Sequence, residues 1–307
     1  TGTADWADAK TYAKKVIDSP YKLYTAKKGQ WSAYQQLFMG DNGENGSSVE
    51  AIFPILQDGK KTTSWGTTLF LMAGCNDNKE RVKSATEKGN NTTEGWAGNR
   101  MRPDLVQKFF PNNDAPNISA YAMPAAADDD RALFDGDGRN VTNGDDENGV
   151  KVFTNGFSVC KFNNFKTDGS AGHDSKFPDA DFFLMRAAEA YLMYAEADAR
   201  QNGGTTTADG AKYINELRSR AHATTYTAYS LRQICDEWSR EFYFEGLRRT
   251  TLIRFGYFGG NVNYNWSWKG GVKNGRNFDA HFNLFPIPTS DLTANGNLAQ
   301  NPGYSSK

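Results

Sequence analysis

Three groups of tryptophans have amide, hydroxyl or guanidinium side chains close by in the sequence, and Trp96 also lacks the apolar neighbours typical of a core position. The groups are Trp96 with Asn99 and Arg100, Trp65 with Thr67 and Thr68, and Trp266 and Trp268 with Asn265. An indole offers a flat apolar face, and the polar side chains beside it can form hydrogen bonds. This combination suits a sugar ring, which has an apolar C–H face and a polar edge. We therefore regard these residues as candidate ligand contacts.

The alternative for any of these rings is ordinary packing in a core. We expect packing for Trp6, Trp31 and Trp238, because they fall on helical or apolar patterns. The whole chain of 307 residues is rich in aromatic residues, with 7 Trp, 14 Tyr and 20 Phe. Its net charge of −1 gives no electrostatic reason to expect nucleic acid or an acidic membrane surface as a partner.

The sequence lacks the motifs that mark several common kinds of enzyme active site. The three histidines, at 173, 222 and 281, form no His-Glu-x-x-His metal pattern. Ser158 lacks the second glycine of a nucleophile elbow, and no glycine-rich phosphate loop is present. A glycoside hydrolase needs only two carboxylates across a cleft, so this alternative stays open. The sequence favours binding without catalysis.

Two aspartate-rich patches, at 128–130 and 135–138, are the candidates for a cation site. A calcium loop alternates its carboxylates in this way but places a glutamate at the twelfth position. Counted from Asp135, that position holds Asp146, and Glu147 follows one residue later. A solvated acidic loop is therefore the favoured interpretation, with calcium as the alternative and no other cofactor expected. Cys75, Cys160 and Cys235 show neither metal-ligand spacing nor a disulfide framework.

Helices must position these residues, and the best defined lie between Asp181 and Gly256. Apolar residues at three- and four-residue steps predict a helix that opens at Phe182, with Asp181 as its N-cap, and ends at 202–204. A second helix is predicted from about Thr207 to Ala221, which completes a helical hairpin. A third is predicted over 230–246.

The third predicted helix carries closely spaced charges on one side. Charges at this density form either a solvated face or a structural ion-pair network. Their helical placement suggests a buried or half-buried network that joins the hairpin to the third helix. Its expected members are Arg186, Glu189, Arg240 and Glu241.

Three motifs in this half of the chain resemble those of the SusD/RagB family of outer-membrane glycan-binding lipoproteins. The motifs are Met185-Arg186-x-Ala188-Glu189-x-x-Leu192-x-x-Ala195-Glu196-Ala197, Trp238-x-Arg240-Glu241-x-x-Phe244-Glu245-Gly246-x-Arg248, and Phe285-Pro286-Ile287-Pro288 followed by Gln300-Asn301-Pro302-Gly303-Tyr304. The resemblance implies capture of oligosaccharides or polysaccharide at the cell surface, lipid anchoring of the full-length protein, and delivery to a TonB-dependent transporter. The alternatives are a peptide-binding module or a module that serves only as a transporter partner.

The expected fold is mainly α, with tetratricopeptide-like helix hairpins that support a large loop-rich, irregular lobe. Residues 1–20 would be the second helix of a truncated repeat, 21–177 the ligand-facing lobe, 178–256 the hairpin with the third helix, and 257–307 an extended strap. Within the lobe we expect strands or extended loops at 49–56 and 152–157 and a short helix at 103–110. The helix from Asp5 to Asp18 would leave an apolar stripe uncovered, formed by Trp6, Ala9, Ala13 and Ile17.

Overall fold

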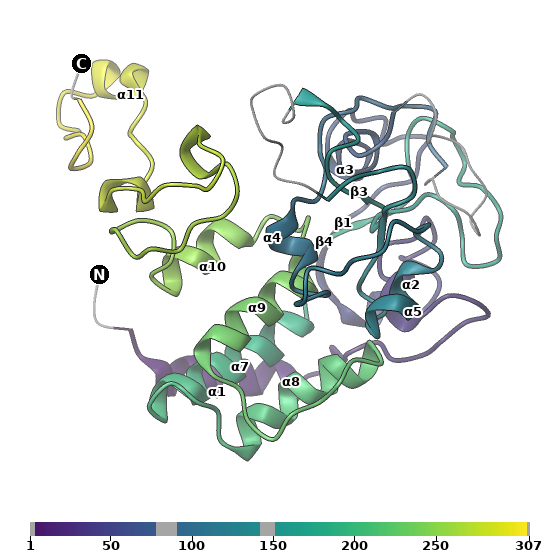
Figure 1. Ribbon diagram of the computed structural model, residues 1–307, viewed down its shortest axis with the longest axis horizontal. Helices are drawn as coiled ribbons and strands as arrows, with labels where there is room; N and C mark the ends of the chain where they lie inside the picture. The colour runs from purple at the N-terminus through teal and green to yellow at the C-terminus, as the bar shows by residue number, and fades with distance from the viewer. Residues whose placement is uncertain (1–3, 78–90, 142–150, 306–307) are drawn as a thin grey trace. The chain divides into compact units, whose positions relative to one another are not determined.

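The computed structural model describes residues 4–77, 91–141 and 151–305, and it divides into two compact units. Unit 1 comprises residues 1–245 and unit 2 comprises residues 246–307. Figure 1 labels most of the helices and strands of both units. No helix within the described ranges has the length and apolar character needed to cross a lipid bilayer.

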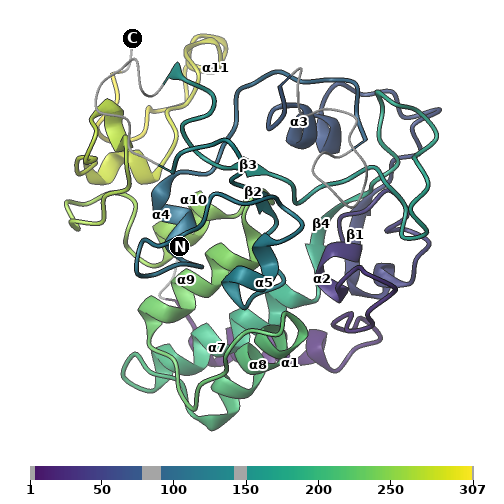
Figure 2. The ribbon, with the colours of Figure 1, turned by 45° about the vertical axis from the view of Figure 1, so that its right-hand side comes forward.

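Four helices form one part of unit 1: α1 (Trp6–Ile17), α7 (Ala188–Gln201), α8 (Ala208–Arg220) and α9 (Leu231–Phe242). Helix α7 packs against the other three, and Figure 2 shows α1 beside α7 and α8. The side chains of Asp5 and Ser230 cap α1 and α9 by accepting backbone N–H groups of the first turn. The predicted hairpin is therefore present as α7 and α8, and the predicted third helix is α9.

The predicted start of the first hairpin helix is wrong. Residues Phe182–Arg186 form strand β4, which pairs antiparallel with β1 (Ala51–Ile55). A short apolar run is compatible with either element, and the hydrogen bonds to a distant strand decide the outcome. Asp181 does not cap a helix; its Oδ1 accepts the backbone N–H of Gln57 at 2.7 Å. The predicted strand at 49–56 is confirmed by β1.

The apolar stripe of α1 is not left uncovered. Ala13 is buried and the other stripe residues are partly buried, with α7 packed alongside. Lys10 Nζ lies 2.6 Å from Asp198 Oδ1 on α7, and the Arg200 guanidinium lies 4.4 Å from the centre of the Trp6 ring. The prediction of an uncovered stripe is therefore wrong, because α7 supplies the covering surface.

The rest of unit 1 consists of short elements joined by long irregular segments. These elements are α2 (Ala33–Gln36), η1 (Ser47–Glu50), α3 (Thr67–Ala73), α4 (Pro103–Val106), α5 (Met123–Ala127), β2 (Phe134–Asp135) and β3 (Ser158–Val159). Helix α4 confirms the start of the helix predicted at 103–110. Of the two alternatives for 152–157, the strand is not formed: Asn155 and Phe157 make isolated bridges, and the strand that pairs with β2 follows at 158–159. The fold is thus mostly helical, with few strands and much irregular structure among the described residues.

Within the described residues, two apolar clusters and a buried charge network help to hold the parts of unit 1 together. One core packs Phe109, Phe110, Phe134, Phe157 and Tyr243. The other packs Tyr34, Leu37, Phe38, Phe162 and Phe183. Tyr243 and Tyr34 both reach the charge network, because the Tyr243 hydroxyl donates to the Arg131 backbone oxygen and the Tyr34 hydroxyl donates to that of Glu241.

Glu241 on α9 is the centre of the network and is fully buried. Its carboxylate contacts the guanidinium groups of Arg220 at 2.5 Å, Arg186 at 2.6 Å and Arg131 at 3.3 Å. A buried network was predicted here, and two of its expected members, Arg186 and Glu241, belong to it and form an ion pair. Arg240 pairs instead with Glu237, at 2.7 Å, and Glu189 accepts the backbone N–H of Arg186 at 3.4 Å. The charges of α9 are therefore largely structural and do not form a solvated face.

Unit 2 contains α10 (Arg248–Arg254), η2 (Lys269–Gly271), η3 (Ala280–Asn283) and α11 (Thr289–Ala294). Its aromatic rings gather around Phe278, whose ring centre lies 5.4 Å from that of Phe258. The Gln300 side chain bonds both the backbone N–H and the carbonyl of Ile287, at 2.8 and 2.9 Å. The two segments of the closing motif are therefore joined to each other.

Candidate functional site

Four aromatic rings form an exposed cluster in the loop-rich part of unit 1: Trp65, Phe70, Trp96 and Phe177, called the aromatic cluster below. The ring centres of Trp65 and Trp96 lie 6.4 Å apart, with the ring planes at 31°. Phe177 meets Trp65 at 5.5 Å, and Phe70 meets Trp96 at 6.0 Å. Trp65 is 54% exposed, Phe70 50% and Trp96 39%. Grouped rings with this exposure offer an open apolar surface for a ligand.

Helix α3 positions one side of the cluster, and it lies away from α7, α8 and α9 in Figure 1. Its residues Leu69 and Met72 are buried, which anchors the helix and leaves Phe70 facing outward. The segment of Trp96 docks on the carboxyl end of α3, where backbone carbonyls lack helical partners. The Trp96 N–H donates to the carbonyl of Ala73 at 2.8 Å, and the N–H groups of 98 and 99 donate to that of Gly74.

The glycines near Trp96 reflect this close approach of backbone segments. A Cβ at Gly74 would lie 2.6 Å from Asn99 Nδ2 and 2.8 Å from the carbonyl oxygen of Phe70. A Cβ at Gly95 would lie 2.8 Å from the carbonyl oxygen of Asp77. Contacts this short require the absence of a side chain. Of the two glycines that flank Trp96 in the sequence, Gly95 is therefore a packing requirement, whereas a Cβ at Gly98 would make an ordinary contact at 3.8 Å.

Glu94 and Lys176 lie beside the two indoles. The Trp96 Nε1–H donates to Glu94 Oε2 at 3.2 Å, and Lys176 Nζ lies 3.6 Å from Glu94 Oε1. The same ammonium lies 5.0 Å from the centre of the Trp65 ring, within cation–π range. Asp174 positions Lys176 and Phe177 by accepting their backbone N–H groups at 2.7 and 2.9 Å. The hydrogen bonds from Phe177 and Lys176 lower the pKa of Asp174.

The structure brings Trp65 and Trp96, which belong to two separate candidate groups, into one cluster. The other two predicted residues of the Trp96 group make backbone contacts of their own. Arg100 Nε donates to the carbonyl of Asn155 at 2.8 Å and its Nη1 to that of Gly98 at 2.9 Å, and burial lowers its pKa. Sequence reasoning missed Phe70, Phe177, Glu94 and Lys176, although Glu94 precedes Trp96 by two residues.

Trp266 and Trp268 belong to unit 2. The Trp266 ring stacks on Phe258 with centres 6.0 Å apart and meets Phe278 edge-on at 6.2 Å. The ammonium of Lys269 lies 4.7 Å from its centre. Trp266 is thus a partly buried ring with packed neighbours and offers less open surface than Trp65 does.

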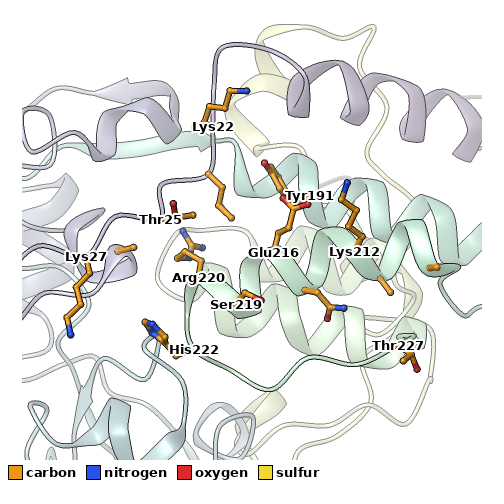
Figure 3. Close-up of a pocket in the computed structure, with 15 residues that line it drawn as sticks. Lys22, Thr25, Lys27, Tyr191, Lys212, Glu216, Ser219, Arg220, His222 and Thr227 are labelled. Atoms are coloured by element: carbon orange, nitrogen blue, oxygen red, sulfur yellow. The ribbon is translucent and has the colours of Figure 1, made fainter.

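A cavity of about 950 Å³ lies elsewhere in unit 1, between the segment 22–27 and α8 (Figure 3). Figure 3 shows Lys212 and Glu216 of α8 and Tyr191 of α7 at its wall. Burial raises the pKa of the Glu216 carboxyl, against the opposing effect of Lys212. Tyr191 is itself buried. The cavity therefore offers charged groups but lacks the open ring faces of the aromatic cluster.

Other side chains that were considered for metal binding or catalysis make contacts within the protein. Asp129 forms an ion pair with Arg131 at 2.8 Å, and Asp135 Oδ2 accepts the backbone N–H of Ala120 at 3.0 Å. The calcium candidates Asp146 and Glu147 lie outside the described residues. Within those residues, no group of three or more His, Cys, Asp or Glu side chains could hold a metal ion. Ser158 is buried, and its hydroxyl donates to the carbonyl of Cys75 at 2.6 Å.

The helical scaffold, the irregular lobe and the closing segment fit one family, and residues 134–304 match it: the chain belongs to the SusD family. It is 41% identical to the starch-binding protein SusD of Bacteroides thetaiotaomicron, over 99% of this chain and 57% of that protein. The chain therefore spans little more than half the length of that relative. The resemblance seen in the sequence motifs is confirmed.

Solved structures share the fold. Surface glycan-binding protein A from Bacteroides thetaiotaomicron, in complex with laminarihexaose, matches with a TM-score of 0.58 at 20% identity, over 96% of this chain and 59% of that one. A SusD-like protein from Bacteroides fragilis matches with a TM-score of 0.60 at 17% identity, over 97% and 62%. At these identities the likeness is one of fold.

Proposed function

We propose that this protein binds glucose-based oligosaccharides without cleaving them, and that the aromatic cluster is the binding surface. The observation that carries the proposal is the exposed pair of Trp65 and Trp96, whose ring planes lie at 31° to each other. Each indole can stack on the apolar face of one sugar unit. Two rings at an angle would contact successive units of a curved chain, and several weak contacts would add up along it.

The polar groups around the rings support the same function. Glu94 and Lys176 lie at the edge of the cluster, where they can also reach hydroxyl groups of a stacked sugar. The similarity to a starch-binding protein makes an α-linked glucan the first candidate, and the neighbour that holds laminarihexaose makes a β-linked glucan the second. Asn99, Arg100, Trp266 and Trp268 stay proposed contacts of lower rank, because each packs against or bonds its own surroundings.

Isothermal titration and affinity electrophoresis with maltoheptaose, amylopectin and laminarihexaose test this proposal. Trp65→Ala and Trp96→Ala should each weaken binding by about 30-fold, the effect of losing about 2 kcal/mol at an interface hot spot. Tyr121→Ala is the matched control, since Tyr121 is 63% exposed outside the cluster. Binding that survives loss of both tryptophans would refute the site.

The setting of this activity is part of the proposal. By the family resemblance, the full-length protein is lipid-anchored at the outer-membrane surface and passes its ligand to a TonB-dependent transporter. Absence of any glycan binding would favour a peptide-binding or transporter-partner module. Release of reducing sugar from the same panel would favour a glycoside hydrolase.

A further inference from the structure

We propose that Glu94 and Lys176 are positioning residues that hold the two indoles of the aromatic cluster at their mutual angle and leave one face of Trp65 open. The inference rests on the proposed function, because it concerns the same ligand site. It adds two residues, of which Glu94 contacts Trp96 and Lys176 contacts Trp65. They also set which ring face a sugar can use.

Glu94 engages two partners with its two carboxylate oxygens. Oε2 accepts the Trp96 Nε1–H at 3.2 Å, and Oε1 lies 3.6 Å from Lys176 Nζ. A hydrogen bond to the indole N–H fixes the rotation of the ring about its side-chain bonds. The backbone N–H of Glu94 donates to the Thr92 hydroxyl at 3.2 Å, which restrains the backbone that carries this side chain. Glu94 thereby sets the orientation of Trp96.

Lys176 connects this arrangement to the other indole. Its ammonium lies 5.0 Å from the centre of the Trp65 ring while it faces Glu94. The neighbouring segments are joined by a hydrogen bond from the Thr93 N–H to the carbonyl of Ser175 at 2.7 Å. The two indoles come from segments 31 positions apart, and the Glu94–Lys176 pair links them through a third segment.

This arrangement restricts how a sugar can bind. The ammonium occupies one face of Trp65, so a sugar ring must stack on the opposite face. The pair is partly exposed, with 40% of the Lys176 side chain and 22% of the Glu94 side chain accessible. Partly exposed ion pairs contribute little to folding stability and are screened by salt. Removing this one should therefore change binding without unfolding the protein.

The test uses Glu94→Gln, Glu94→Ala and Lys176→Met in the whole chain, with Lys14→Met as the control for loss of an exposed, ion-paired lysine elsewhere. Near-ultraviolet circular dichroism of the free protein reports the relative orientation of the indoles. Titration with maltoheptaose, a neutral sugar, at low and at high salt reports affinity. Melting temperature confirms that each variant is folded.

We expect Glu94→Ala to weaken maltoheptaose binding by about 10-fold. Glu94→Gln should weaken it by about 3-fold, because the glutamine keeps an acceptor for the indole N–H. Lys176→Met should also weaken it by about 3-fold, because it removes only the partly exposed ion pair. Wild type should bind this neutral sugar about 2-fold more weakly at 1 M salt, and Lys176→Met should lose that dependence. The dichroism of the indoles should change in Glu94→Ala and stay unchanged in Lys14→Met.

The outcomes separate the two proposals. If wild type binds maltoheptaose and Glu94→Ala changes neither affinity nor dichroism, the positioning role is refuted while the binding function stands. If wild type binds none of the glucans, the proposed function fails, and the dichroism of Glu94→Ala alone decides whether Glu94 orients Trp96. An unchanged spectrum would then refute the positioning role as well.

Discussion

Replacing Glu241 by alanine tests whether the buried charge network holds unit 1 together. Glu241 is fully buried, and its carboxylate is shared by Arg131, Arg186 and Arg220. Burial alone would raise the pKa of this carboxyl, but the guanidinium groups of Arg220, Arg186 and Arg131 outweigh it and hold the pKa well below the usual range. The side chain is therefore a buried anion at neutral pH.

The expected cost follows from the number of partners left behind. Glu50 also binds Arg186 and Arg220, at 2.8 and 3.1 Å, so neither becomes wholly unpaired in the variant. Arg131 likewise keeps Asp129 and Glu237. Removing one partner of a buried ion pair costs about 3–5 kcal/mol, and we expect about 4 kcal/mol because three cations lose one anion while other anions remain. At about 2 °C per kcal/mol for a chain of this size, the melting temperature should fall by about 8 °C.

Chemical denaturation followed by circular dichroism measures the loss, and a second variant separates charge from volume. Glu241→Gln fills the same space, so its loss reports the missing charge, and we expect at least about 2 kcal/mol. Asp18→Ala is the control, because the Asp18 carboxylate is exposed and pairs only locally with Lys14. It should leave the denaturation midpoint unchanged.

A Glu241→Ala variant that loses less than about 1 kcal/mol would refute this reasoning. It would mean that water or the remaining carboxylates replace Glu241 at little cost. The network would then be no stronger than a set of surface ion pairs. A large loss in Asp18→Ala would equally show that burial does not separate the two kinds of pair.

The remaining predictions concern pH and helix packing. Burial raises the pKa of the Glu237 carboxyl, but the guanidinium groups of Arg131, Arg240 and Arg218 outweigh this effect and lower the pKa to about 2. A carboxyl whose pKa is lower in the folded state stabilises the protein at pH values above its pKa in the unfolded chain, about 4.3. The free energy of unfolding should therefore fall as the pH is lowered from about 5 to about 2. Urea midpoints that stay constant over this range would contradict the prediction. Gly210→Ala on α8 should destabilise by about 1–3 kcal/mol, although alanine ordinarily favours a helix, because its Cβ would overlap the buried Asp198 carboxylate of α7. Thermal unfolding measures this loss of stability, with Ser219→Ala, at an exposed position on the same helix, as the control. A stabilised Gly210→Ala would show that the helices can separate.

The sequence by itself determined the helical hairpin, the third helix and the family. Apolar residues recur at three- and four-residue steps in α7 and α8, and such local patterns survive without knowledge of the fold. Trp65 and Trp96 were also recognisable, because each stands alone among polar and glycine residues. The membership of Arg186 and Glu241 in a buried ion-pair network was also expected, from their predicted helical placement.

Only the tertiary structure decided which distant segments meet. Residues 182–186 form a strand because β1 provides hydrogen-bond partners more than 120 positions away. Arg131 gave no signal in the sequence, yet it is fully buried between Asp129, Glu237 and Glu241. Lys176 and Phe177 join the aromatic cluster only because the 174–177 turn packs beside the 92–96 segment. Hydrogen bonds and burial between such segments depend on the folded chain as a whole, so no local pattern can encode them.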